Sequence, residues 1–111
     1  MSNQCVRLFV TGRVQGVFFR QSLKAKSIQN NIFGWVKNLQ DGRVECILEG
    51  TEENISILVK WAHTGPANAI VENIEIHDEK FNNEFTNTYS FLPRKKYIVI
   101  VNTFYIPTLY H

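Results

Sequence analysis

The stretch Thr-Gly-Arg-Val-Gln-Gly-Val-Phe-Phe-Arg, residues 11–20, marks the point where a strand-like run gives way to a helical pattern at about Phe18. Its two glycines, Gly12 and Gly16, tolerate positive φ, so the chain can turn successive N–H groups toward one point. A helix N-terminus favours negative charge, and Arg20 adds a planar fork of donors, so we expect a site for a small oxyanion here. The alternative is an ordinary strand-to-helix turn with a solvated arginine, because neither G-x-G-x-x-G nor the P-loop pattern is present.

Composition bounds the class of protein. A chain of 111 residues has room for one domain and one core, and its 44% of hydrophobic residues excludes wholesale disorder. The net charge of +2 does not call for nucleic acid or an anionic membrane, so an anion would have to be bound by a local site. No secretory signal region is visible, and no apolar run reaches the ~18 residues that a membrane span needs. We therefore expect a cytoplasmic protein.

The two cysteines, Cys5 and Cys46, fall inside strand-like runs. No Cys-x-x-Cys spacing or Cys/His cluster indicates a metal site. Two interpretations remain open: both thiols are free and buried, or a single bridge joins them if their strands are neighbours.

The apolar pattern predicts a β-α-β-β-α-β order of elements. Strands are expected at 5–11, 32–38, 44–49 and 70–77. One helix should run from about Phe18 to the Asn30-Asn31 pair, and a second from Thr51, as N-cap, to the Gly65-Pro66 stop. In the second helix, apolar residues at i, i+3, i+4 and i+7 form a stripe that should face the core: Ile55, Leu58, Val59 and Ala62. This order predicts a ferredoxin-like α+β sandwich, with both helices on one face of an antiparallel sheet of four to five strands.

The C-terminal part of the chain is less regular. A polar segment at 78–87 is followed by a fifth predicted strand at 88–92, and residues 97–106 are strand-like by propensity. We divide the chain into a domain at 1–92 and an apolar extension at 93–111. The extension either adds a strand to an edge of the same sheet or pairs with another chain, so we expect a monomer with a tail-mediated dimer as the alternative.

Two segments resemble the signatures of the acylphosphatase family. The first is Gly12-Arg13-Val14-Gln15-Gly16-Val17 with Phe18, Phe19 and Arg20 after it. The second is Gly34-Trp35-Val36-Lys37-Asn38, then Asp41-Gly42-Arg43-Val44-Glu45, ending at Gly50. The likeness covers about residues 4–92. It implies a small ferredoxin-like enzyme that hydrolyses the carboxyl–phosphate anhydride of acyl phosphates with no metal or cofactor.

The resemblance also implies residue roles. Arg20 would bind the phosphate, together with backbone N–H groups of Gln15, Gly16, Val17 and Phe18. Asn38 would orient the attacking water, which an amide can do without taking its proton. The partner would be a small acyl phosphate or inorganic phosphate, and the sequence does not choose between carbamoyl phosphate and other mixed anhydrides.

One other class of function remains open: a non-catalytic phosphate-binding or interaction module with the same fold. An RNA-binding role is disfavoured, because no RNP-type aromatic strand is present. The predicted topology places the ends of the first two strands at one edge of the sheet. The loop around Gly16 and the residue Asn38 should therefore meet there.

Overall fold

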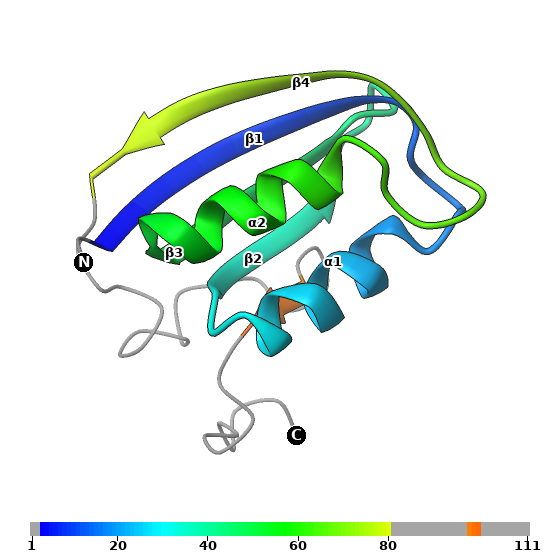
Figure 1. Ribbon diagram of the computed structural model, residues 1–111. Helices are drawn as coiled ribbons and strands as arrows, with labels where there is room; N and C mark the ends of the chain where they lie inside the picture. Colours follow the sequence, from blue (N-terminus) through cyan, green and yellow to red (C-terminus); the bar gives the residue numbers. More distant parts are fainter. Residues whose placement is uncertain (1–2, 81–97, 101–111) are drawn as a thin grey trace.

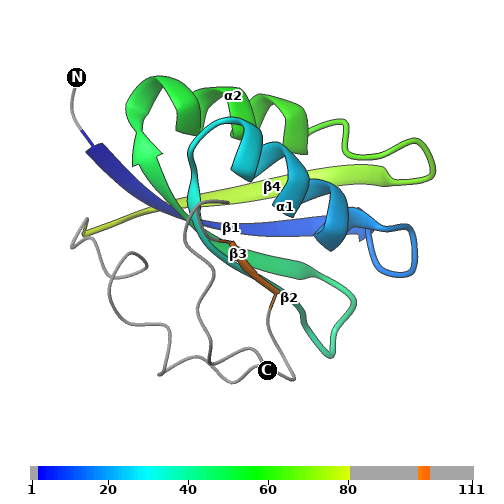
Figure 2. The same cartoon turned by 90° about the horizontal axis from the view of Figure 1, so that it is seen from below.

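The computed structural model describes residues 3–80 and the short strand 98–100. Both helices cover the same face of the sheet (Figures 1 and 2). The strand order is β4-β1-β3-β2-β5. The elements are β1 (Asn3–Arg13), α1 (Phe19–Gln29), β2 (Phe33–Asn38), β3 (Val44–Thr51), α2 (Glu52–Ala62), β4 (Ile70–Glu79) and β5 (Ile98–Ile100). The predicted ferredoxin-like α+β fold is confirmed.

The topology brings the ends of β1 and β2 together. β3 is antiparallel to both of these strands and lies between them. β1 and β2 therefore run in the same direction and end at one edge of the sheet, as Figure 2 shows. The loop that follows β1 and Asn38 at the end of β2 thus share this edge, as expected.

The main core lies between the sheet and the helices. Alternate residues of β1, Val6, Leu8 and Val10, are at most 2% exposed and meet the buried faces of α1 and α2. The predicted stripe of α2 is buried at Ile55, Leu58 and Ala62, while Val59 is partly buried beside it. The stripe locks α2 onto the sheet because its apolar surface is removed from water.

Helix ends follow their sequence signals. The Thr51 hydroxyl accepts a hydrogen bond from the Asn54 N–H at 3.2 Å, so the predicted N-cap of α2 is confirmed. Asn31 adopts a left-handed conformation with φ 55°, directly after α1 and its cap residue Asn30. This is the role expected of an asparagine at a helix end.

β1 is longer than the sequence predicted, and this changes the role of Gly12. The strand includes Gly12 and Arg13, which pair with Val71 and Ile70 of β4, with an irregularity between Thr11 and Gly12. A Cβ at Gly12 would lie 2.1 Å from the Ile70 carbonyl oxygen. Glycine is thus required by the close approach of β4, and placing Gly12 in the oxyanion loop was wrong.

Gly34 lies where β3 approaches the backbone of β2 too closely for a side chain. Its φ is 150°, and a Cβ there would lie 1.8 Å from the backbone oxygen of Ile47 on β3. Because backbone atoms cannot yield as a flexible side chain does, Gly34→Ala should lower the free energy of unfolding by more than about 3 kcal/mol. Urea denaturation measures this loss.

The matched control is Gly42→Ala in the hairpin between β2 and β3. Gly42 also has positive φ, 97°, but a Cβ there meets no described atom within 4 Å. We expect the smaller loss, about 1 kcal/mol, from backbone strain alone. An equal loss in the two variants would show that the contact with β3 does not matter.

Both cysteines are free. Cys46 belongs to the main core, whereas Cys5 belongs to a second cluster with Trp35 and Ile47. Cys46 pairs with Leu8, three positions beyond Cys5 along β1, so the two thiols lie on opposite faces of the sheet. The alternative of a bridge between neighbouring strands was therefore wrong. Burial raises the pKa of each thiol to about 12, so both stay protonated at neutral pH.

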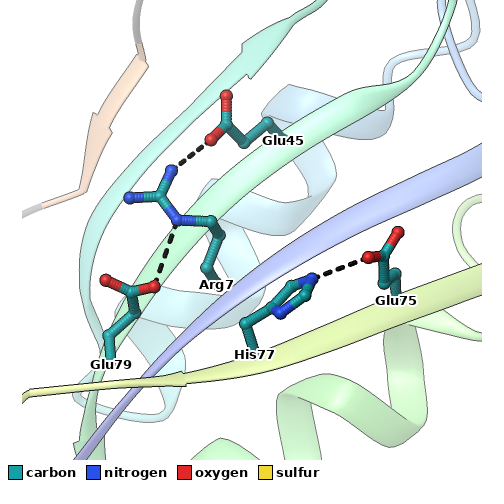
Figure 3. Close-up of polar contacts among 5 residues, drawn as sticks. All are labelled: Arg7, Glu45, Glu75, His77 and Glu79. Atoms are coloured by element: carbon teal, nitrogen blue, oxygen red, sulfur yellow. Dashed lines mark hydrogen bonds and ion pairs between the residues drawn. The ribbon is translucent and has the colours of Figure 1, made fainter.

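The sheet face opposite the helices carries ion pairs that connect its strands. Arg7 on β1 contacts Glu45 on β3, and its Nε lies 3.3 Å from a Glu79 oxygen on β4 (Figure 3). Along β4, the His77 Nε2 lies 2.8 Å from a Glu75 oxygen. Arg7 thus connects three neighbouring strands, which helps to keep the β1–β3–β4 part of the sheet in register.

Toward the C-terminus, β4 is longer than predicted and β5 extends the sheet. Residues 78 and 79 belong to β4 rather than to a polar segment. β5 pairs antiparallel with Gly34–Val36 of β2, so residues 98–100 of the extension do add a strand to the same sheet, as expected. The predicted strand at 88–92 and the rest of the extension lie outside the described residues. Within 3–80 and 98–100, no helix is long and apolar enough to cross a membrane.

Candidate active site

The loop between β1 and α1 alternates between buried and outward-facing residues. Val14, Val17 and Phe19 are 1%, 6% and 1% exposed and belong to the main core. Gly16 and Phe18 between them are exposed, and Arg20 is partly exposed. The apolar anchors fix the loop, and the groups that could contact a ligand face outward.

This loop and the end of β2 enclose one hollow of about 380 Å³. The described residues that line it are Val14, Gly16, Phe18, Phe19, Arg20, Gln21 and Asn38. Of the predicted site residues, the structure therefore brings together Gly16, Phe18, Arg20 and Asn38. Gln15 and Val17 lie in the loop but are not among the described residues that line the hollow.

The start of α1 is suited to an anion. Phe18 is the N-cap residue, and within the described chain no side chain caps this end and no acidic residue lies in the first turn. α2 differs, because Thr51 caps it and Glu52 and Glu53 occupy its first turn. The free N–H groups of α1 and its positive dipole end thus stay available to a ligand, next to the guanidinium of Arg20.

The Gln15 side chain connects the loop to the hairpin after β2. Its Nε2 donates to the Leu39 carbonyl oxygen at 2.7 Å and to the Arg43 carbonyl oxygen at 2.9 Å. Leu39 directly follows Asn38, so these bonds fix the distance between the loop and the asparagine. The sequence predicted only a backbone role for Gln15, because local sequence carries no signal for a contact 24 residues away.

The charges around the hollow fit an anionic ligand. Among the described lining residues, Arg20 is the charged one, so no carboxylate there would repel an anion. Across the described parts of the chain, no group of three or more His, Cys, Asp or Glu side chains is placed to hold a metal ion. The arrangement offers hydrogen-bond donors, one cation and one amide around a small hollow.

The chain is similar to known proteins of one family. The family model described as Acylphosphatase matches residues 6–91. The acylphosphatase of Rubrobacter xylanophilus is 49% identical over 74 residues, which cover 67% of each chain.

Two solved structures give the same result. The structure of an acylphosphatase from Coxiella burnetii is 39% identical, covers 72% of this chain and 84% of its own, and superposes with a TM-score of 0.70. The crystal structure of acylphosphatase from Bacillus subtilis is 33% identical, with coverages of 74% and 91% and a TM-score of 0.71. The chain therefore belongs to the acylphosphatase family and is an enzyme, a hydrolase.

Proposed function

We propose that the protein hydrolyses the carboxyl–phosphate anhydride bond of small acyl phosphates, to a carboxylate and inorganic phosphate, without a metal or other cofactor. One observation carries the proposal. The open N-terminus of α1, with Arg20 in its first turn, shares a single hollow with Asn38. The first half of this site suits a phosphate group and the second suits a water molecule.

The phosphate group would be held at the start of α1. Arg20 donates from a planar fork to two non-bridging oxygens, and backbone N–H groups between Gln15 and Phe18 donate to the others. A carboxylate is a good leaving group, so phosphoryl transfer needs positioning and charge stabilisation more than a strong base. Donors that are already in place supply both without reorganisation during the reaction.

Asn38 would hold the attacking water in line with the bond that breaks. Its amide both accepts and donates hydrogen bonds, so it can fix a water molecule that stays protonated. The water oxygen forms a bond to phosphorus as the bond from phosphorus to the acyl oxygen breaks. The carboxylate leaves with the bonding electrons, and both water protons end on the phosphate as dihydrogen phosphate. The substrate's own phosphate oxygen thus takes the place of a general base.

Gln15 would act as a positioning residue in this scheme. Gln15→Ala removes both bonds to the hairpin, so Asn38 would no longer be held against the loop. We expect kcat for acetyl phosphate to fall about 10-fold, because small misplacements of reacting groups are costly. The inhibition constant of inorganic phosphate should change less than threefold, because Arg20 and the helix end remain.

The control for Gln15 is Gln29→Ala, which removes an exposed glutamine at the other end of α1. It should leave both constants unchanged. In the proposed site, the backbone N–H groups of residues 15–18 and the Arg20 side chain together form the phosphate cradle. If Gln15→Ala weakens phosphate binding as much as it lowers kcat, the Gln15 side chain shapes this cradle and does not position Asn38.

The function is tested by release of phosphate from acetyl phosphate in the presence of a chelator. We expect full activity after chelation. p-Nitrophenyl phosphate should not be hydrolysed, because an aryloxide is a poorer leaving group than a carboxylate. Absence of acetyl phosphate turnover, or loss of it on chelation, would refute the proposal.

A further inference from the structure

Phe18 has an unusual combination of exposure and backbone conformation. It is 75% exposed, more than the other large hydrophobic residues exposed in the described chain, Ile57, Ile70 and Ile76 at 47–58%. Its φ is 64°, a left-handed conformation that is an outlier for a bulky residue. Such a conformation persists only where the surrounding structure holds it.

The neighbours of Phe18 keep its backbone in this left-handed conformation. Val17 and Phe19 on either side are buried in the main core. The Phe18 carbonyl oxygen accepts the Ser22 N–H at 3.0 Å and so begins the hydrogen bonding of α1. The backbone is fixed on both sides, so the aromatic side chain is directed away from the core.

Phe18 lines the same hollow as Arg20 and Asn38. Phosphate binding uses charged and polar donors and gains nothing from an aromatic ring. An acyl phosphate, however, also has an acyl group. When the phosphate is bound in the cradle, this acyl group has to extend toward the open side of the hollow. Phe18 is the exposed aromatic side chain among the described lining residues, so it is placed to meet that group.

We propose, resting on the hydrolase function proposed above, that Phe18 contacts the acyl group and makes the site favour acyl phosphates with aromatic acyl groups. Phosphate, Arg20 and Asn38 are common to every substrate. The ring would act only on the part that differs between substrates. Phe18 is in this sense a specificity-determining residue and has no part in bond breaking.

The test compares benzoyl phosphate with acetyl phosphate. Phe18→Gly removes the ring and also suits the left-handed backbone, so the variant should fold. We expect the ratio of kcat/KM for benzoyl over acetyl phosphate to fall about 5-fold in Phe18→Gly, as expected for loss of one aromatic contact. The ratio for Phe18→Leu should lie between those of the wild type and Phe18→Gly. Ile57→Ala, which truncates an exposed apolar residue on α2, should keep the wild-type ratio.

A binding measurement separates this inference from the function on which it rests. Benzoylphosphonate and acetylphosphonate lack the anhydride oxygen and are not hydrolysed, so calorimetry gives their dissociation constants without turnover. A preference for the benzoyl compound that disappears in Phe18→Gly supports the role of Phe18. An unchanged preference overturns it. If the wild type hydrolyses neither acyl phosphate, the proposed function fails, and the phosphonate preference still decides whether Phe18 contacts the acyl group.

Discussion

Replacing Arg20 with alanine should lower kcat/KM for acetyl phosphate by about 10³-fold or more and should abolish competition by inorganic phosphate. Arg20 is the charged residue among the described lining of the hollow, and it stands in the first turn of an uncapped helix. Donors aimed at a transferring phosphoryl group in this way are each associated with effects of about 10²–10⁵-fold. Steady-state kinetics with phosphate as inhibitor measure both changes.

Two further variants test whether the effect depends on the guanidinium group and on the position of Arg20. Arg20→Lys keeps a positive charge but loses the planar fork, so it should recover only part of the activity. Arg13→Ala removes an exposed arginine from the end of β1, outside the described lining of the hollow, and should change kcat/KM less than threefold. Undiminished phosphate inhibition in Arg20→Ala would show that the cradle lies elsewhere.

Replacing Asn38 with alanine should lower kcat by about 10²–10³-fold while the inhibition constant of phosphate stays within about twofold. The amide would act on the water and not on the bound phosphate, so removing it should affect the reaction and spare binding. The side chain is exposed at the end of β2, so its loss should not affect stability. Thermal unfolding checks this last point.

Gln40→Ala is the matched control for Asn38, because Gln40 is an exposed polar residue of the same hairpin. It should behave as wild type. If Asn38→Ala weakens phosphate inhibition as strongly as it lowers kcat, Asn38 binds the phosphate group, and the water must be held by another residue.

The fold and the position of the site could be predicted because their signals are local. The apolar pattern predicted the two helices. Thr51 lies at the start of α2 and Asn31 follows the end of α1, as their side-chain chemistry favours. Alternation of strands and helices then implied that β1 and β2 end at the same edge. The resemblance to the family signatures named Arg20 and Asn38, and the topology then predicted that the two residues lie near each other.

The features that could not be predicted depend on contacts between distant segments. The need for glycine at Gly12 comes from Ile70 of β4 and not from the loop sequence around it. The Gln15 side chain contacts carbonyl oxygens of a hairpin whose distance in space no local pattern reveals. The pairing register of β1 with β3 decides that Cys5 and Cys46 lie on opposite faces. Tertiary packing thus supplied what periodicity and turn chemistry could not.

The fate of the water oxygen shows which atom of the substrate is attacked. In the proposed mechanism, α1 and Arg20 hold the phosphoryl group while a water molecule at Asn38 attacks phosphorus. Hydrolysis of acetyl phosphate in ¹⁸O-labelled water, followed by mass spectrometry of both products, should place the label in inorganic phosphate and leave the acetate unlabelled. Label in the acetate would mean attack at the carbonyl carbon and would overturn the proposed mechanism.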